Sequence, residues 1–525
     1  MRLASHPTAL SRVQMAGVAA GAVAVLAIAM LPVLTVLVPP MADYINHLAR
    51  LHILATIDDS AHLQRLYAVR WRITPYVGMD AIGLLLAKLM PILWVGRVLV
   101  MLVMALFLLG AMLLHRALYG RISAWPLLAG LFLYSFPLYM GFLPYLLSAA
   151  LAVVGFAVWV WGERWPAWSR LGAGALAALV AFLSHYAGIV ALALCFAGYE
   201  ASRWWQGGRN RHEIGPRLLA VSLPFVLPLA LSLAVAGAAH AGPTTYDHWS
   251  QHLRGLRSAT LYPGSRFDLA ILGFGAVALA AGLATRRVVV APALWLPVGA
   301  MMLATLVLPG APMGLWGMQF RLPVVAAVII AAGVRPVRAG WPEGVAAVVA
   351  GALFLGHVAT IGVSWMPLDA QYRELRAALV QVPRGSRLLS FVTKAGGDRG
   401  IPRAPFVSWM HMPALAVIER DVFYPNLHKQ PMMTVHATAL TAPISPYEST
   451  PSAESDLWDG LVTSVGGIVR QRVDPSGRLV YWADWPRHFD MVIGLHFGAD
   501  PDLPPALELV HRGSFFSLYR VVRPE

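Results

Sequence analysis

The most informative shortage in this sequence is that of charged residues. Only 13% of the 525 residues are Asp, Glu, Lys or Arg, whereas 58% are hydrophobic. A soluble globular domain carries about 25% charged residues, so water is not the solvent for most of this chain. Lysine is scarcer still, since Lys88, Lys394 and Lys429 are the only three, and nearly all the positive charge is arginine. The composition excludes an ordinary soluble protein and predicts an integral membrane protein.

Cysteine is almost absent too. The single cysteine, Cys195, lies inside an apolar run and excludes an intrachain disulfide. The sequence contains no CxxC pair, HExxH motif, nucleotide-binding loop or nucleophile elbow. We therefore assign no cofactor and no metal ligands, although a divalent metal is compatible with the sequence.

The net charge of +14 might suggest a nucleic-acid-binding protein. The basic residues, however, fall in small groups between apolar runs, which is typical of membrane topology. We expect the lipid bilayer as a partner and no nucleic acid.

Eleven apolar segments approach the roughly 20 residues that cross a bilayer as a helix. They are Met15–Val38, Val95–His115, Ala124–Met140, Phe142–Trp161, Leu171–Ser184, Ala187–Trp204, Leu218–Ala238, Leu269–Thr285, Val288–Leu308, Leu322–Val334 and Val345–Val363. The segment Val77–Leu93 is short, contains Asp80 and Lys88, and is predicted to lie along the membrane surface. The fold class predicted is a polytopic α-helical membrane protein with about eleven transmembrane helices.

The arginines between these segments predict the orientation. With Val77–Leu93 not crossing the membrane, every group falls on one side, which the positive-inside rule makes the cytoplasm. The groups are Arg2 and Arg12; Arg116 and Arg121; Arg164 and Arg170; Arg203, Arg209, Arg211 and Arg217; Arg286 and Arg287; and Arg335 and Arg338. We predict a multi-pass protein of a bacterial inner membrane with a cytoplasmic N-terminus.

Two domains are expected from this topology. Residues 1–365 form the transmembrane domain, with a long first outer loop at 39–94. Residues 366–525 form a small periplasmic α/β domain of ordinary soluble composition. Strands are predicted at Arg387–Val392, Met491–His496 and Phe515–Val522, and a helix at Gln371–Val380.

The first outer loop opens with Pro39-Pro40-Met41-Ala42-Asp43-Tyr44-Ile45-Asn46-His47, followed by Leu48-Ala49-Arg50. The prolines end the first span, and a helix restarts near Asp43. Spacing of four residues then places Asp43 and His47 on one face, with Arg50 close by. The alternative is an N-cap aspartate beside a surface histidine. An acid at the membrane boundary is costly unless it is solvated or paired, so Asp43 and His47 are candidate catalytic residues.

Arginine also occurs on the outer side, where the positive-inside rule does not explain it. Arg321 precedes the tenth span in the segment Gln319-Phe320-Arg321, and Arg97 opens the second. A guanidinium matches a phosphate bidentately. Arg321, Gln319 and Arg97 are candidate lipid-phosphate ligands, and snorkelling to ordinary headgroups is the alternative.

Three further polar sites lie in outer loops. Asp247, His248 and His252 form a segment in which the two histidines are four residues apart, the spacing of metal ligands on a helix, but with no clear third ligand. His185 occupies a tight turn between two spans. Together with Arg50, these are candidate substrate-binding residues.

These features resemble the GT-C glycosyltransferases, in particular uncharacterised bacterial members. The resemblance covers roughly residues 30–335 and rests on three segments, Asp43-Tyr44-Ile45-Asn46-His47, Tyr139-Met140-Gly141-Phe142-Leu143 and Gln319-Phe320-Arg321. It implies a polyprenyl-phosphate-linked sugar donor and inverting transfer to a glycan, lipid or protein acceptor on the periplasmic face. Asp43 matches the family's acidic residue of the first loop, the usual catalytic base.

Three alternatives remain from the residues alone. An O-antigen ligase or polymerase would use His248, His252, Arg254 and Arg257, with Asp43 dispensable. A transporter or flippase of envelope lipids would need ionisable residues near the bilayer midplane, of which the predicted spans have few. A non-catalytic protein would use its C-terminal domain to bind an envelope partner.

Overall fold

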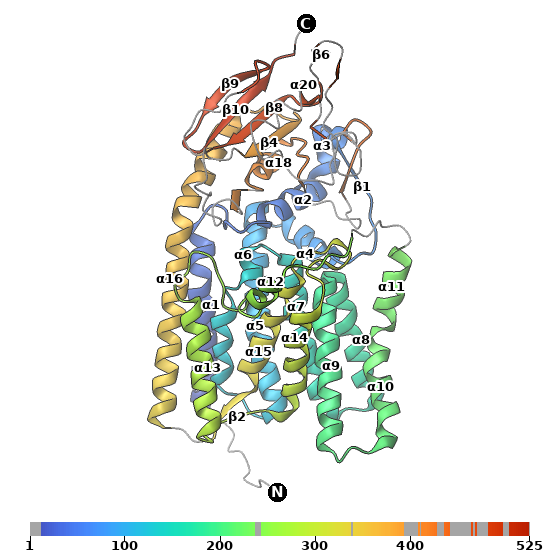
Figure 1. Cartoon of the computed structure of the whole chain (residues 1–525), viewed down its shortest axis with the longest axis vertical. Helices are drawn as coiled ribbons and strands as arrows, with labels where there is room; N and C mark the ends of the chain where they lie inside the picture. The colour runs from blue at the N-terminus through green and yellow to red at the C-terminus, as the bar shows by residue number, and fades with distance from the viewer. Residues whose placement is uncertain are drawn as a thin grey trace. The chain divides into compact units, whose positions relative to one another are not determined.

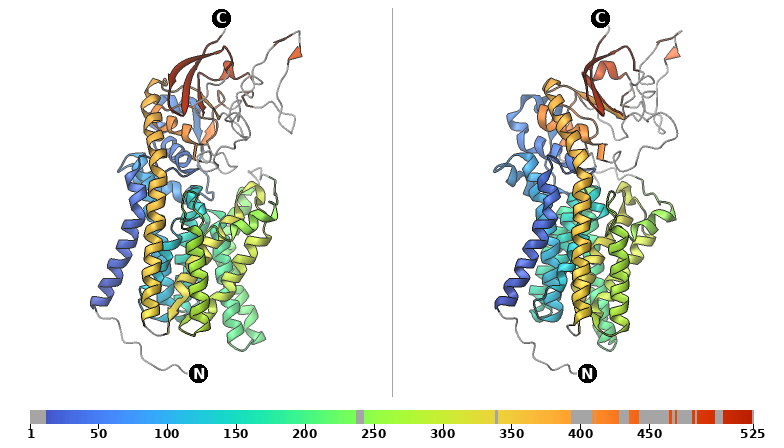
Figure 2. Two further views of the ribbon diagram at one scale, coloured as in Figure 1. Left: turned by 60° about the vertical axis from the view of Figure 1, so that its left-hand side comes forward. Right: turned by 90° about the vertical axis from the view of Figure 1, so that its left-hand side faces the viewer.

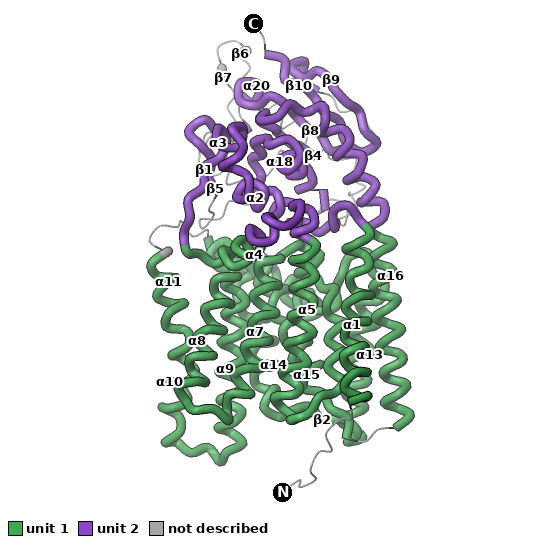
Figure 3. The backbone as a smooth tube through the Cα atoms, turned by 180° about the vertical axis from the view of Figure 1, so that it is seen from behind, with its two compact units in different colours: residues 1–35, 73–82, 97–364 green, residues 36–72, 83–96, 365–525 purple. Residues whose placement is uncertain are grey.

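The structure is a computed structural model. It describes residues 12–236, 243–337, 340–392, 408–409, 411–427, 435–441, 464–465, 468–469, 481–482, 484–496 and 503–523. The chain divides into two compact units, coloured separately in Figure 3. Unit 1 contains residues 1–35, 73–82 and 97–364, and unit 2 contains residues 36–72, 83–96 and 365–525.

Unit 1 is a helical bundle whose long helices run roughly alongside one another (Figures 1 and 2). Helix α7 packs against α8 and α9, and α9 packs against α14. The bounds of its helices are α1 Arg12–Thr35, α5 Ile92–Tyr119, α7 Leu143–Trp161, α8 Ala167–Ser184, α9 Tyr186–Gln206, α10 Ile214–Ser222, α11 Val226–Ala236, α12 Trp249–Gly255, α13 Asp268–Ala284, α14 Trp295–Val307, α15 Leu322–Gly333 and α16 Trp341–Ala378. The first residues of α5 and the last residues of α16 belong to unit 2.

Within the described residues, six helices are long and apolar enough to cross a membrane. They correspond to α1, α5, α7, α8, the α10–α11 segment and α16. The eleven predicted spans also included α9 and three shorter apolar helices, at Asp268–Ala284, Pro292–Val307 and Met318–Gly333. The protein is a mostly helical, polytopic membrane protein, as the composition predicted.

The predicted span Ala124–Met140 is wrong as a single helix. The chain instead forms a 3₁₀ segment at Trp125–Phe132, followed by the four-residue helix α6, Phe136–Tyr139. Pro126 and Pro137 each stand in the first turn of one piece. Proline suits a first helical turn but interrupts a helix interior, so the apolar run becomes two short pieces.

Arginines of several of the predicted groups gather at one end of unit 1. Arg116 stacks over the ring of Trp161 at 4.8 Å, and Arg203 forms an ion pair with Glu163 at 3.0 Å. These contacts bring together the C-terminal ends of α5, α7 and α9. At the same end, β2 (Val288–Val290) pairs antiparallel with β3 (Val334–Pro336), and Arg335 lies over the ring of Tyr119. The gathering is the arrangement that the sequence-based orientation requires.

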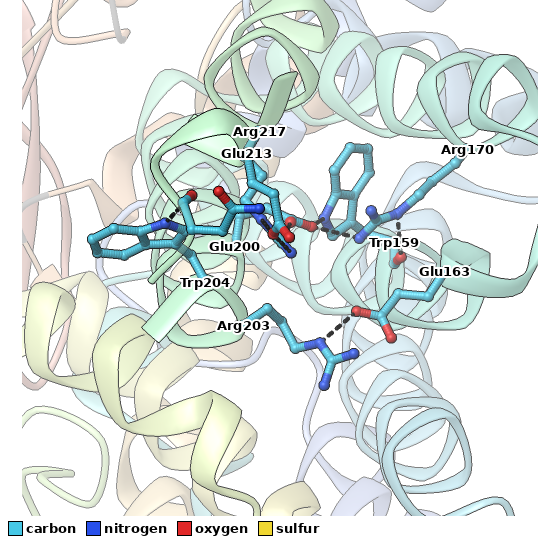
Figure 4. Close-up of polar contacts among 9 residues, drawn as sticks. Trp159, Glu163, Arg170, Glu200, Arg203, Trp204, Glu213 and Arg217 are labelled. Atoms are coloured by element: carbon cyan, nitrogen blue, oxygen red, sulfur yellow. Dashed lines mark hydrogen bonds and ion pairs between the residues drawn. The ribbon is translucent and has the colours of Figure 1, made fainter. Parts of the chain in front are cut away.

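Glu200 is the centre of a buried polar cluster at this end (Figure 4). Its carboxylate accepts hydrogen bonds from Trp159 Nε1 at 3.1 Å, Arg170 Nη2 at 2.6 Å and Arg217 Nη1 at 2.7 Å. The cluster joins α7, α8, α9 and α10. A buried carboxylate is tolerated because two guanidinium groups neutralise it.

Unit 2 is built on a four-stranded mixed sheet of order β4-β8-β10-β9. Strand β4 (Leu388–Val392) is parallel to β8 (Met491–Leu495), and β10 (Phe516–Val521) is antiparallel to both β8 and β9 (Leu507–Arg512). The predicted strands at 387–392, 491–496 and 515–522 are confirmed, and β9 was missed. The predicted helix Gln371–Val380 is confirmed as the end of α16.

Segments of the first outer loop complete unit 2. Helix α2 (Tyr44–Thr56) packs against α18 (Leu415–Arg420), and β1 (Tyr67–Val69) pairs antiparallel with β5 (Val435–Ala437). Tyr67 Oη donates to Val422 O at 3.2 Å and accepts from Tyr424 N at 2.8 Å. Short helices α3 (Ala61–Leu66) and α20 (Trp485–His488) also belong to this unit, and α4 (Val77–Ala87) contributes residues to both units.

Candidate active site

Asp43 stands where α2 begins. After Pro39-Pro40, the chain turns through Met41 and enters the helix at Tyr44. Asp43 occupies the N-cap position, but its backbone is already αR and its side chain makes no capping hydrogen bond. Only 8% of the residue is exposed. Helix capping therefore does not explain this buried carboxylate.

His411 is a basic group that lies beside Asp43. His411 Nε2 lies 3.5 Å from Asp43 Oδ1, and His411 Nδ1 lies 2.9 Å from Asn46 Nδ2. The same Asn46 nitrogen donates to Asn426 O at 2.7 Å, which fixes the orientation of the amide. An amide nitrogen only donates, so His411 Nδ1 is the acceptor, and the proton of the neutral imidazole sits on Nε2. The protonated nitrogen of the neutral imidazole is therefore the one that lies beside the carboxylate of Asp43.

The other two predicted residues of α2 are buried in the same helix. His47 is 8% exposed and Arg50 is 4% exposed. The backbone hydrogen bond from His47 N to Asp43 O, at 3.0 Å, places His47 one helical turn after Asp43. The predicted four-residue relationship is confirmed.

In unit 1, Arg321 is the buried cation of a second candidate cluster. It is 4% exposed and precedes the first residue of α15. Its guanidinium carbon lies 4.3 Å from the centre of the Phe142 ring and 5.1 Å from that of Tyr145. Arg321 Nη2 donates to Trp316 O at 2.9 Å, and Tyr145 Oη donates to Arg321 O. An arginine held this way does not snorkel to the lipid surface.

His185 lies beside Arg321. The extended backbone of His185 separates α8 from α9, and its Nδ1 accepts from Ala187 N at 2.9 Å. Because Nδ1 is the acceptor, a neutral His185 carries its proton on Nε2. That nitrogen lies 3.4 Å from Arg321 Nη1 and 3.3 Å from Tyr76 Oη. Two N–H donors, one charged, thus converge, which is an arrangement that an anionic oxygen can accept.

Tyr76 has an unusual backbone conformation. Its φ is +93°, in a region that residues with a Cβ rarely occupy. Its ring meets His185 edge-on, with centroids 5.0 Å apart. Backbone strain of this kind concentrates at functional sites. The sequence offers no signal that would have found Tyr76.

Gln319 and Asp247 form a contact that the sequence did not predict. Gln319 Nε2 donates to Asp247 Oδ2 at 2.5 Å, although the two are 72 residues apart. A Cβ at Gly310 would meet the same carboxylate oxygen, so glycine is required there for the loop to close over Asp247. The buried Gln319 is thereby fixed two residues before Arg321. Arg97, the other predicted phosphate ligand, is also buried, near the start of α5.

The two histidines of the third outer loop are used separately. His248 Nδ1 accepts from Ser250 N and caps α12, whereas the buried His252 bonds through Nδ1 to Thr305 O at 3.0 Å. Among the described residues, no group of three or more His, Cys, Asp or Glu could hold a metal ion.

Two solved structures share this fold. Crystal structures of ArnT from Cupriavidus metallidurans, in the apo state and bound to undecaprenyl phosphate, match with TM-scores of 0.56 and 0.55. Each match covers 98% of this chain and 100% of the other, at 13% sequence identity. No protein-family model and no curated protein sequence matches the chain.

The helical bundle, the small mixed sheet and these matches define a polytopic membrane protein. Its fold is shared with the ArnT structures, which supports the GT-C-like fold that the sequence resemblance predicted.

Proposed function

We propose that this protein is a glycosyltransferase that moves a sugar from a polyprenyl-phosphate donor to an acceptor hydroxyl, with inversion at the anomeric carbon. The observation that carries the proposal is the buried carboxylate of Asp43, which stands at a helix start without capping it. The fold adds support, because a protein of this fold has been crystallised with undecaprenyl phosphate.

In this reaction Asp43 accepts the proton of the acceptor hydroxyl. The hydroxyl oxygen attacks the anomeric carbon, the bond from that carbon to the phosphate oxygen breaks, and its electron pair leaves with the polyprenyl phosphate. A general base of this kind contributes about 10²- to 10⁴-fold in rate. His411 positions the carboxylate through its Nε2–H, and Asn46 fixes the tautomer of His411.

Arg321 and His185 supply the donors for the departing phosphate. A phosphate leaves as a stable anion, so its departure needs positive charge and hydrogen-bond donors rather than a general acid. Donors fixed in advance at such an oxygen are worth roughly 3–4 kcal/mol each. Arg321 is held on two aromatic rings and His185 is held by Ala187 N, so both donors are already ordered.

The experiment is a comparison of Asp43→Asn with Asp59→Asn, an exposed acid of the same loop. Purified variants are assayed with a panel of undecaprenyl-phosphate-linked sugars and a membrane lipid extract as acceptor. We expect Asp43→Asn to lose at least about 10²-fold in turnover at an unchanged melting temperature, and Asp59→Asn to be fully active. Full activity of Asp43→Asn would refute the mechanism; if His252→Ala were then inactive, the ligase-type alternative would be favoured.

We further infer that the arginine-bearing end of unit 1 faces the cytoplasm and that residues 366–525 form a periplasmic domain. The positive-inside rule and the gathering of the arginines support this orientation. Replacing Cys195 gives a cysteine-free background. A cysteine at Ser60 should react with an impermeant maleimide on intact cells, and one at Ala117 should not; the reverse pattern would refute the orientation.

A further inference from the structure

The arginine-bearing end of unit 1 contains a cavity of about 400 Å³. Its walls are the C-terminal ends of α5, α7 and α9 and the residues that begin the helical segment at Pro292. The volume lies within the range of small-molecule sites, about 300–1,000 Å³. None of the residues assigned above to the reaction lines it.

Three arginines line this cavity, namely Arg116, Arg164 and Arg203. Among the described residues of its wall, Glu163 is the only acidic one, so the wall carries a net charge of about +2. Glu163 pairs with Arg203 at 3.0 Å, and Arg116 rests on the ring of Trp161. In the part of the chain that the structure describes, Arg164 forms no ion pair.

The neighbouring Glu200 cluster differs from the cavity wall, because its arginines are paired with carboxylates. Glu200 pairs with Arg170 and Arg217 at 2.6 and 2.7 Å, and Glu213 also pairs with Arg217 at 2.9 Å, so two carboxylates balance these two arginines. Figure 4 shows these pairs beside Arg203 and Glu163. Arg170 and Arg217 therefore have their own carboxylate partners, whereas the wall of the cavity keeps a net positive charge. Ala293, near the start of the helical segment, adds the positive end of a helix dipole.

The aromatic residues of the wall suit a ligand at the membrane boundary. Tyr119, Trp161 and Tyr199 all line the cavity. Tyrosine and tryptophan favour the depth of lipid headgroups, and basic pockets between transmembrane helices on the cytoplasmic side bind anionic headgroups. Guanidinium groups are the preferred partners of phosphate oxygens.

We propose that this cavity binds a phosphate group, supplied by an anionic phospholipid or by free phosphate. The headgroup phosphate is held by Arg116, Arg164 and Arg203, and Glu163 weakens the binding because it competes for Arg203. The proposal is independent of the transferase reaction.

The test uses the full chain in detergent, with bound lipid measured by native mass spectrometry and stability by the melting temperature. Dioleoyl-phosphatidylglycerol should bind and stabilise the wild type. Phosphatidylcholine, whose phosphate is compensated by a cation, should do neither. Arg164→Gln and Arg203→Gln should each lower the affinity for phosphatidylglycerol at least about 10-fold, since a hydrogen bond to a charged group contributes this much.

Two further variants sharpen the test. Arg211→Gln removes an arginine of the same end that does not line the cavity, so its affinity should equal that of the wild type. Glu163→Gln should bind phosphatidylglycerol more tightly than the wild type, which a loss of folding could not produce. All four changes are at exposed positions, so melting temperatures without lipid should stay close to that of the wild type.

Inorganic phosphate is the second arm. Stabilisation by millimolar phosphate, lost in Arg164→Gln and Arg203→Gln but kept in Arg211→Gln, would identify free phosphate as the ligand. The proposal is overturned if neither phosphatidylglycerol nor phosphate distinguishes the cavity variants from Arg211→Gln.

Discussion

His411 Nε2 approaches Asp43 Oδ1 to 3.5 Å, although the two residues are far apart in the sequence. The imidazole is held in one tautomer by Asn46, whose amide donates to Nδ1. The proposed base thus depends on a residue of the C-terminal segment.

This relationship predicts that His411→Phe lowers turnover about 10- to 100-fold, because a misplaced base loses rate without losing substrate binding. KM should change little, and Asn46→Leu should behave in the same way. The control is His511→Phe, which should be active. His511 lies on β9 and forms a hydrogen bond with Gln381. Equal activity of His411→Phe and the control would show that His411 does not position Asp43.

Arg321→Lys keeps the charge but loses the planar fork and the stacking on Phe142 and Tyr145. We expect the Kd for undecaprenyl phosphate to rise by about 10-fold or more, since a bidentate contact is lost. The binding is measured by titrating the lipid against the purified protein. Arg257→Lys, at an ion pair of 3.7 Å with Asp268, serves as the control. An unchanged Kd in Arg321→Ala would refute phosphate binding by Arg321.

Asp421 predicts an acid-dependent loss of stability in unit 2. Burial raises its pKa, but hydrogen bonds from His52 and Ser60 and the charge of Arg384 outweigh burial and hold the pKa below its ordinary value of 3.8. A depressed carboxyl pKa stabilises the folded state above pH 3.8, and that stabilisation is lost as the pH falls through the folded value.

Asp421→Asn should therefore lower the melting temperature at pH 7, by an amount corresponding to about 1–2 kcal/mol. Once the pH is below the lowered pKa of Asp421 in the folded protein, the variant and the wild type should melt together. Asp484→Asn, at a surface pair with Arg487, should melt like the wild type at both pH values. A difference between Asp421→Asn and the wild type that persists at low pH would exclude the charge of Asp421 as its cause.

The division of the chain predicts the behaviour of an isolated C-terminal segment. A polypeptide of residues 366–525 lacks α2 and β1, and with them His52 and Tyr67. We expect it to show no cooperative unfolding transition by circular dichroism. Fusing residues 36–72 to its N-terminus should restore one. Cooperative unfolding of the segment alone would mean that the first loop is dispensable for its fold.

The sequence predicted those parts of the fold that depend on local pattern. The strand at Met491–Leu495 is entirely apolar and completely buried, so its composition alone indicates it. Strand β9 has the sequence Leu-Glu-Leu-Val-His-Arg and is largely exposed. Its sequence therefore lacks the run of apolar residues that indicates a buried strand. The helix α16 continues through Pro367, where a break between the last span and the next helix was expected. The first-turn prolines of 125–139 had the opposite effect and divided one apolar run.

The residues of the candidate site also fall into those that the sequence could predict and those that it could not. Asp43, His47 and Arg321 could be selected because each is a charged or ionisable residue at a position where the membrane makes it costly. His411 could not, because its relation to Asn46 spans 365 residues and leaves no periodicity in the sequence. The link between Gln319 and Asp247 likewise depends on how two loops meet.

The hydrogen bonds between Tyr67 and the segment at Val422–Tyr424 also affect when unit 2 can fold during synthesis of the chain. Tyr67 and Tyr424 are 357 residues apart, and chains are synthesised at about 5–20 residues per second, so Tyr67 waits roughly 20–70 s for its partner. During that interval the edge of β1 has no strand beside it, and His411 has not yet been made. The contacts that hold α2 and β1 in unit 2 therefore cannot form until the C-terminal segment has been synthesised, long after most helices of unit 1.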